Sequence, residues 1–421
     1  MKPTVFSIVA DTFSRRWFAV GFACFLVASV FGCLLRYFWV GDIDWISYRH
    51  VLHAHSHLAL LGWAFTLVSG GLLFMLLPPV RARAVVYRWV LGLNVVAAIG
   101  MSVAFALQGY GLYSIGFSAV HLVGAYLFSY CFLRDLRRLP ASTERRLARW
   151  AVYWMVVSTL GLWAIAPITA ALGKLHPLYY ASIQFFLHFQ FNGWLTFGVL
   201  ALLLSWLQRR GRVVDFPLLL FVGLQLSLLL TYALSVSWST PLTIVFVLNS
   251  VGVLLQLAVF IGIGRRLFTA FSQLEFKDSY VSWLLWLGLG SLAAKILVQS
   301  AVAIPVLAEV ALTVRNFVIG FIHLTTLGSI SLTVIALLVS VGLLSASRQA
   351  VVGYGCLVVA FLSTELLLFG QGLLLWLGLG YRPLYYEFLF GSSLLFPLGL
   401  ACIVAAFSPR LYSQKLQSST L

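Results

Sequence analysis

Charged residues are scarce in this chain of 421 residues, and acidic residues are the scarcest. Asp, Glu, Lys and Arg together make up only 9% of the sequence, whereas 62% of it is hydrophobic. Such a composition cannot cover a water-soluble surface, and apolar runs near 20 residues match a hydrocarbon core about 30 Å thick. The composition therefore excludes a soluble globular protein and predicts a polytopic helical membrane protein.

The sequence also lacks a polar stretch long enough for a separate soluble domain. Its five cysteines lie inside predicted spans without paired spacing, and no Cys-x-x-Cys-His phrase occurs, which excludes covalent c-type heme attachment. We expect a single transmembrane domain over residues 1–421. Its predicted spans are 17–37, 50–78, 86–108, 110–133, 147–172, 179–207, 216–236, 242–263, 280–304, 316–345, 351–376 and 386–407.

The formal net charge of +16 is explained by topology rather than by nucleic acid. If the N-terminus is cytoplasmic, the run from Arg134 to Arg149 and most other basic residues lie on the inner side. The outer side keeps only Arg36, Arg49, Lys174, Arg315 and Arg382. This asymmetry follows the positive-inside rule and indicates a lipid bilayer as partner, not nucleic acid. We expect a bacterial-type inner (cytoplasmic) membrane protein with both termini cytoplasmic.

One short phrase occurs three times. The copies are His57-Leu-Ala-Leu-Leu-Gly62, His188-Phe-Gln-Phe-Asn-Gly193 and His323-Leu-Thr-Thr-Leu-Gly328. They fall in every fourth predicted span, which predicts three repeats of four helices, at roughly 17–133, 147–263 and 280–407. Each repeat then holds one histidine at the same depth near the outer side. Histidines aimed at one axis in this way can bind heme or metal.

Further histidines precede the first copy. His50, His53 and His57 follow an i, i+3, i+7 pattern and share one helical face, whereas His55 points elsewhere. Neutral imidazole suits iron, copper and zinc, so this face can supply a heme axial ligand together with a metal ligand or a propionate donor. A solvated interfacial cluster is the alternative. In each copy the glycine is expected about 140° round the α-helix, where it lets a macrocycle or a neighbouring helix approach.

These features resemble the catalytic subunit of the heme-copper oxidase superfamily, which has twelve spans and metal-binding histidines in spans 2, 6 and 10. The stretch from His53 to Gly62, followed by Leu77-Pro78-Pro79, also resembles the second span of NnrS-type proteins, which contain heme and copper and are linked to nitric oxide metabolism. The resemblance implies that His53 or His57 is axial to a heme together with His323. It further implies that His188 binds a copper or other metal or faces the heme, with His50 and His55 as further candidate metal ligands.

The sequence departs from the oxidase pattern at three places. Predicted span 7 has no histidine, span 6 lacks the Pro-Glu and the tyrosine expected after its histidine, and span 10 offers His323 alone. The resemblance therefore implies a reduced ligand set without a complete copper site. Arg49 and Arg382, on the outer side, can neutralise heme propionates, although interfacial anchoring explains them equally well.

The sequence thus predicts a heme-binding membrane redox protein involved in respiratory electron transfer or in handling nitric oxide or oxygen. A redox subunit or cytochrome and a small gas would be its partners, and whether it is a heme-dependent oxidoreductase is left open. The alternative is a heme-free transporter, channel or metal-handling protein on the same scaffold. His121 is expected to be structural. Lys295 and Glu365 fit a helix-helix ion pair or an internal hydrogen bond better than a proton path.

Overall fold

A computed structural model describes residues 10–237, 239–274 and 279–407 of the chain. Over these ranges the chain is all-helical and contains no strand. Twelve helical segments are long and apolar enough to cross a membrane, which confirms the predicted multi-pass, all-α membrane fold. The arrangement in three fourfold repeats stays a prediction.

Eight of the twelve spans are single α-helices. They are α1 (Thr12–Tyr37), α5 (Val85–Gln108), α6 (Leu112–Leu136), α7 (Thr143–Leu172), α10 (Leu218–Ser237), α11 (Thr243–Phe271), α12 (Ser279–Ala301) and α16 (Arg348–Trp376). The last span consists of α17 (Tyr385–Ser393) and α18 (Leu395–Ala405), and two short helices, α4 (Pro79–Ala82) and α13 (Pro305–Thr313), lie in loops. The largest difference from the predicted ends is at α11, which continues past 263 because Arg265 and Arg266 are good helix formers.

The other three spans change helix type along their length. Span 2 is α2 (Tyr48–His57), η1 (Leu58–Ala64) and α3 (Phe65–Leu76); span 6 is α8 (Pro177–His188), η2 (Phe189–Leu195) and α9 (Thr196–Arg209); span 10 is α14 (Arg315–His323), η3 (Leu324–Leu332) and α15 (Thr333–Ser340). The η segments are π-helical.

The contacts divide the chain into two compact units. Among the described residues, unit 1 comprises 132–334, apart from 238 and 275–278, together with 372–379, and unit 2 comprises 10–131, 335–371 and 380–407. Spans 2 and 6 therefore belong to different units, and span 10 is shared, with His323 in unit 1.

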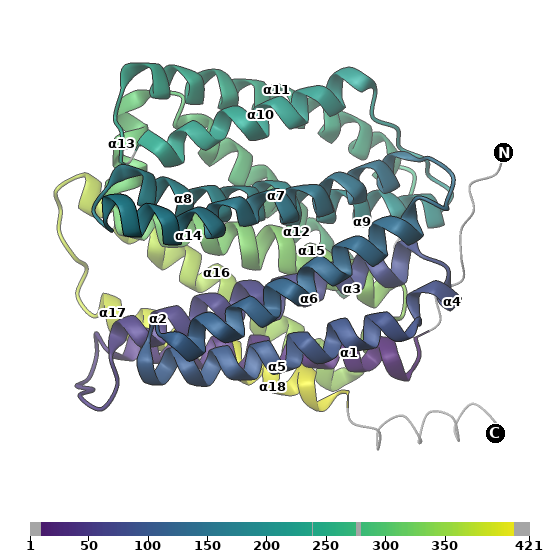
Figure 1. The fold of residues 1–421 in the computed structure, drawn as a ribbon, viewed down its shortest axis with the longest axis horizontal. Coiled ribbons are helices and arrows are strands. Elements are labelled where there is room, and N and C mark those ends of the chain that lie inside the picture. Colours follow the sequence, from purple (N-terminus) through teal and green to yellow (C-terminus); the bar gives the residue numbers. More distant parts are fainter. Residues whose placement is uncertain (1–9, 238, 275–278, 408–421) are drawn as a thin grey trace. The chain divides into compact units, whose positions relative to one another are not determined.

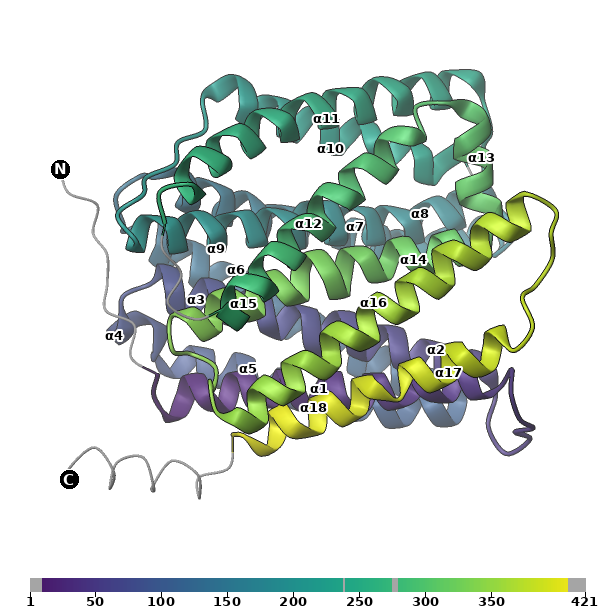
Figure 2. The same ribbon diagram turned by 180° about the vertical axis from the view of Figure 1, so that it is seen from behind.

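Unit 1 encloses span 6 between neighbouring helices. Helix α7 packs against α8, η2 and α9, while α10 and α11 run side by side (Figures 1 and 2). Trp154 Nε1 on α7 donates a 2.8 Å hydrogen bond to Gln225 Oε1 on α10, and the Tyr232 hydroxyl donates to the Ala181 carbonyl over 2.8 Å. These contacts tie α7, α8 and α10 together around His188.

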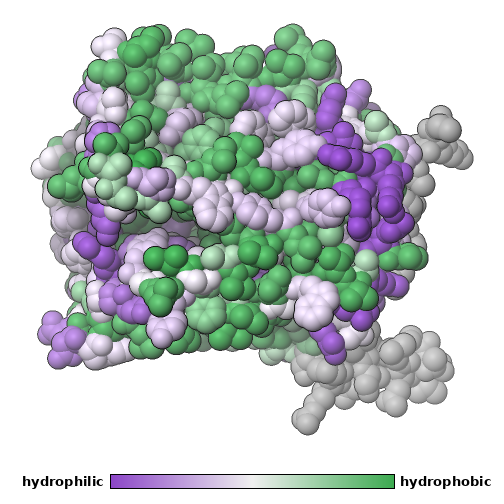
Figure 3. All heavy atoms as spheres, viewed as in Figure 1, coloured by the Kyte–Doolittle hydropathy of each residue, from purple (hydrophilic) through white to green (hydrophobic). Residues whose placement is uncertain are grey.

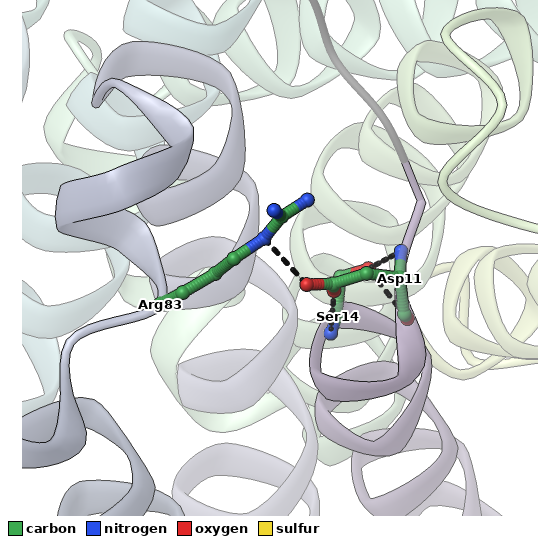
Figure 4. A network of polar contacts seen from close by, with 3 residues as sticks. All are labelled: Asp11, Ser14 and Arg83. Carbon is green, nitrogen blue, oxygen red and sulfur yellow. Dashed lines mark hydrogen bonds and ion pairs between the residues drawn. The ribbon is translucent and has the colours of Figure 1, made fainter.

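Unit 2 is organised around α1, which contacts α2, η1 and α3. At its start the Asp11 carboxylate accepts from the Ser14 backbone N–H over 2.8 Å, and the Ser14 hydroxyl accepts from the Asp11 N–H over 3.0 Å (Figure 4). Arg83 Nε also lies 2.5 Å from the same carboxylate. This capping box satisfies two N–H groups of the first turn, and the ion pair fixes the loop before α5 beside it.

The surface matches a lipid environment. Figure 3 shows hydrophobic residues along the flanks of the helices and a concentration of hydrophilic residues at the end of unit 1 where the α6–α7 loop lies. That loop contains the predicted basic run from Arg134 to Arg149. An apolar flank with basic residues at a helix end is the pattern expected of a bilayer protein.

Candidate functional site: the three histidine junctions

Each copy of the repeated phrase lies at a change of helix type. The phrase histidine is the last α-helical residue of its segment, and the π-helix begins at the next residue in all three copies. No other π-helix occurs in the described parts of the chain. Because π-helical turns are rare and are frequent at functional sites, the threefold coincidence marks the phrase as a structural unit. The sequence analysis did not foresee the π-helices.

The three histidines also lie at similar depths in the most enclosed spans. They are the tenth, twelfth and ninth residues of their spans. The most apolar windows of these spans are 78%, 83% and 78% buried, whereas the other nine spans range from 22% to 50%. The three histidines therefore lie at similar distances from the starts of their spans, and their equal depth in a membrane stays a prediction.

The phrase glycines serve helix packing in two of the copies. A Cβ on Gly62 would lie 3.0 Å from Cys24 Cβ on α1, and one on Gly193 would lie 2.7 Å from Trp154 Cβ on α7. A neighbouring helix, rather than a macrocycle, fills these positions. The predicted 140° offset assumed α-helical geometry, and the π-helical residues after the histidine make the offset smaller, because a π-turn contains more residues than an α-turn.

In unit 2, His57 has one engaged ring nitrogen and one that is available. Its Nδ1 lies 2.9 Å from the His53 carbonyl, one turn back on the same helix. A carbonyl only accepts, so Nδ1 carries the proton and Nε2 keeps its lone pair. Nε2 lies 3.4 Å from the Tyr110 hydroxyl, and the ring packs 4.1 Å from Phe105. This tautomer is the one that a metal-binding imidazole requires.

The other histidines of span 2 divide between two faces, as the spacing predicted. His53 packs its ring 4.5 Å from Tyr110, and the ring of His50 lies against Gly109. His55 points toward α1 instead, with Nδ1 2.7 Å from the Ala28 carbonyl. The His50, His53 and His57 face therefore meets the end of α5 and the loop that follows it, and His55 does not join this group.

His121 in α6 is held by backbone. Its Nε2 lies 3.0 Å from the Leu61 carbonyl of η1, and its ring contacts Phe65 edge to face at 4.8 Å. The Leu61 carbonyl lies within a π-segment, where it gains a side-chain donor. This geometry agrees with the structural role predicted from the sequence.

In unit 1, both ring nitrogens of His188 are engaged. Its Nε2 lies 2.8 Å from the Leu228 carbonyl on α10, and its Nδ1 lies 3.3 Å from Asn192 Nδ2. The carbonyl requires Nε2–H as donor, so Nδ1 accepts from the amide of Asn192. Binding a metal through His188 would therefore require one of these hydrogen bonds to be given up. Metal ligation by His188 stays a prediction.

The network continues to a buried lysine for which the sequence favoured an ion pair or an internal hydrogen bond. Lys295 Nζ on α12 donates to Asn192 Oδ1 over 2.6 Å. The internal hydrogen bond, one of the two roles that we expected for Lys295, is therefore confirmed. The link between His188 and Lys295 was missed, although Asn192, four residues after His188 on the same side of the helix, was the available signal.

The remaining candidates are His323, Arg49 and Arg382. His323 is half-buried at the junction of α14 and η3 in unit 1. Arg49 and Arg382 belong to unit 2, and both are exposed. No group of three or more His, Cys, Asp or Glu side chains able to hold a metal ion occurs among the described residues. Of the predicted copper or other metal ligands, His50 and His55 belong to unit 2 and His188 to unit 1, and their role as ligands stays a prediction.

Comparison with known proteins adds no family to this description. No protein-family model matches the chain, and no curated protein matches it. The functional argument therefore rests on the histidine junctions themselves.

Proposed function

We propose that this chain is a heme-binding integral membrane redox protein in which His57 is a heme ligand and His323 is a further candidate heme ligand. The observation that carries the proposal is the position of both histidines at an α-to-π junction in a highly enclosed span. The resemblance to the heme-copper oxidase catalytic subunit and to NnrS-type proteins supports the same pair of spans.

The tautomer of His57 fits a heme ligand. Its Nδ1–H is held by the His53 carbonyl, so the ring is oriented and the Nε2 lone pair is available to iron. Among the described residues, the weak 3.4 Å contact with the Tyr110 hydroxyl is what competes for that lone pair. Bound there, a heme would supply one-electron redox chemistry and binding of a diatomic gas.

His57 is a better candidate than His53. His53 lies in the middle of α2, whereas His57 occupies the junction that recurs at His188 and His323. The aromatic rings of Phe105 and Tyr110 shield His57 from water, which favours a buried redox group. Respiratory electron transfer or the handling of nitric oxide or oxygen is the role that such a group supports, with a redox subunit or cytochrome as electron partner.

The proposal is tested by the reduced-minus-oxidised optical spectrum of the protein purified in detergent after expression with ample heme. Wild type should show sharp reduced bands, and His323→Ala should lose them while His121→Ala keeps them. Addition of carbon monoxide or nitric oxide then shows whether an iron position is open. A wild-type protein without heme would contradict the proposal and favour the heme-free transporter, channel or metal-handling alternative.

A further inference from the structure

Lys295 is the most buried charged residue of the described chain, at 1% exposure. It lies inside α12, six residues before the end of that helix. Its Nζ contacts Asn192 Oδ1 at 2.6 Å and lies 5.9 Å from the centre of the Phe321 ring. Ionisable residues in such positions are costly in a membrane and usually functional.

No counter-charge for Lys295 occurs among the described residues of unit 1. Its four described carboxylates are placed elsewhere: Asp135 beside Arg134, Glu144 beside Ser142, Asp215 beside Thr143 and Phe216, and Glu309 exposed on α13. An ammonium group has three N–H donors, and here one neutral amide oxygen accepts. A buried charge without a partner is strongly disfavoured, so the neutral amine is the favoured resting form.

The packing also limits what Lys295 can bind. The side chain is enclosed by α12, η2 and η3, and α12 and η3 are in extensive contact. A proton is the species that can join the amine without moving these helices. Both the amine and the ammonium can donate to Asn192 Oδ1, so the hydrogen bond survives in either state.

Asn192 links proton binding at Lys295 to His188. While Lys295 donates to Asn192 Oδ1, the amide must present its Nδ2 to His188 Nδ1. This orientation keeps the proton of His188 on Nε2, which donates it to the Leu228 carbonyl. The chain of donors therefore runs in one direction, from Lys295 through Asn192 and His188 to the α10 backbone. The Lys295 amine fixes the orientation of the Asn192 amide, and that amide fixes the tautomer of the His188 imidazole.

We propose that Lys295 is an intramembrane proton-binding site that takes up one proton from water, R–NH2 becoming R–NH3⁺, when negative charge enters unit 1, and returns it when that charge leaves. An electron on a redox group or a bound anion would be such a charge. The titratable or charged groups on the elements packed against Lys295 are His188, reached through Asn192, Arg315 and His323 on α14, and Arg265 and Arg266 on α11. The proposal holds with or without a heme.

Nitrogen NMR of the wild-type protein tests the proposal directly. The chain has only five lysines, so labelling the lysine side-chain nitrogen gives a small set of signals. One signal should change between ammonium and neutral amine at a lower pH than the other four, and it should be missing in Lys295→Met. Five signals that titrate together would overturn the proposal.

Thermal unfolding in detergent between about pH 5.5 and 9.5 gives an independent readout. The unfolded chain takes up the Lys295 proton more readily than the fold does, so the wild-type midpoint should fall below that of Lys295→Met in acid, and the gap should close in alkali. Gln299→Met, buried one turn further along α12, is the matched control and should follow wild type. Parallel wild-type and Lys295→Met curves would contradict the proposal.

Discussion

The same six-residue phrase produces two different environments in the two units. In unit 2, His57 is half-buried with one ring nitrogen bonded to its own helix and the other facing a tyrosine hydroxyl at 3.4 Å. In unit 1, His188 is buried, and both nitrogens are engaged by α10 and by Asn192. The π-junction is thus a common positioning element, and the neighbours of each histidine decide whether it keeps a lone pair for a ligand.

The largest expected effect on stability comes from the glycine at the unit 1 junction. Gly193→Leu would place a side chain against Trp154, because even a Cβ lies 2.7 Å from Trp154 Cβ. Overpacking of this kind costs about 1–3 kcal/mol or more. We expect a large drop in the unfolding midpoint in detergent. Gly92→Leu, where a Cβ meets nothing within 4 Å, is the control and should change little.

The next largest effect on stability distinguishes His188 from His57. His188→Phe keeps the ring volume but leaves the Leu228 carbonyl and Asn192 without their partner, at a cost of about 1–3 kcal/mol. His57→Phe removes a bond to its own helix only and should cost less. Denaturant unfolding of both variants makes the comparison. Equal destabilisation would show that the two environments do not differ in the way described here.

A smaller effect is expected at Asn192. Asn192→Leu removes both hydrogen bonds of the amide and should lower stability by about 1–2 kcal/mol, because buried groups on His188 and Lys295 lose a partner. Asn192→Leu in a Lys295→Met background should cost less than in wild type, since the lysine is no longer left unpaired. Additive costs in this double-mutant cycle would show that the two residues are uncoupled.

The smallest effect is expected at Tyr110. Its hydroxyl lies 3.4 Å from His57 Nε2, at the long end of a hydrogen bond, and the side chain is exposed. Tyr110→Phe should change the unfolding free energy by under about 0.5 kcal/mol. If heme binds at His57, heme content should be retained in this variant. A marked loss of stability would mean that Nε2 is committed to the tyrosine.

The spans, and the faces on which the span 2 histidines lie, could be predicted from the sequence because both depend on local patterns. Runs of apolar residues define twelve helices, and the i, i+3, i+7 spacing placed His50, His53 and His57 on one face and His55 on another, as observed. The partners of these histidines were not predictable, because they come from distant parts of the chain. Leu228, which accepts from His188, is 40 residues away from it along the chain. Lys295, which donates to Asn192, is 103 residues away from Asn192.

The π-helices could not be derived from composition, because a π-turn is chosen by packing rather than by residue type. The five-residue spacing from histidine to glycine was present in all three copies, and it matches the closure of a π-turn. That spacing was interpreted with α-helical geometry, which gave too large an angle between histidine and glycine. A five-residue spacing that recurs inside predicted spans therefore indicates that a π-helix should be considered beside an α-helix.

The most direct test of the central claim compares the optical spectra of His57→Ala and His188→Ala, each purified in detergent beside wild type. The account predicts that His57→Ala loses the reduced heme bands, because the available Nε2 is gone. His188→Ala should keep them, although its stability falls. Loss of heme in His188→Ala with retention in His57→Ala would contradict the assignment of the two environments.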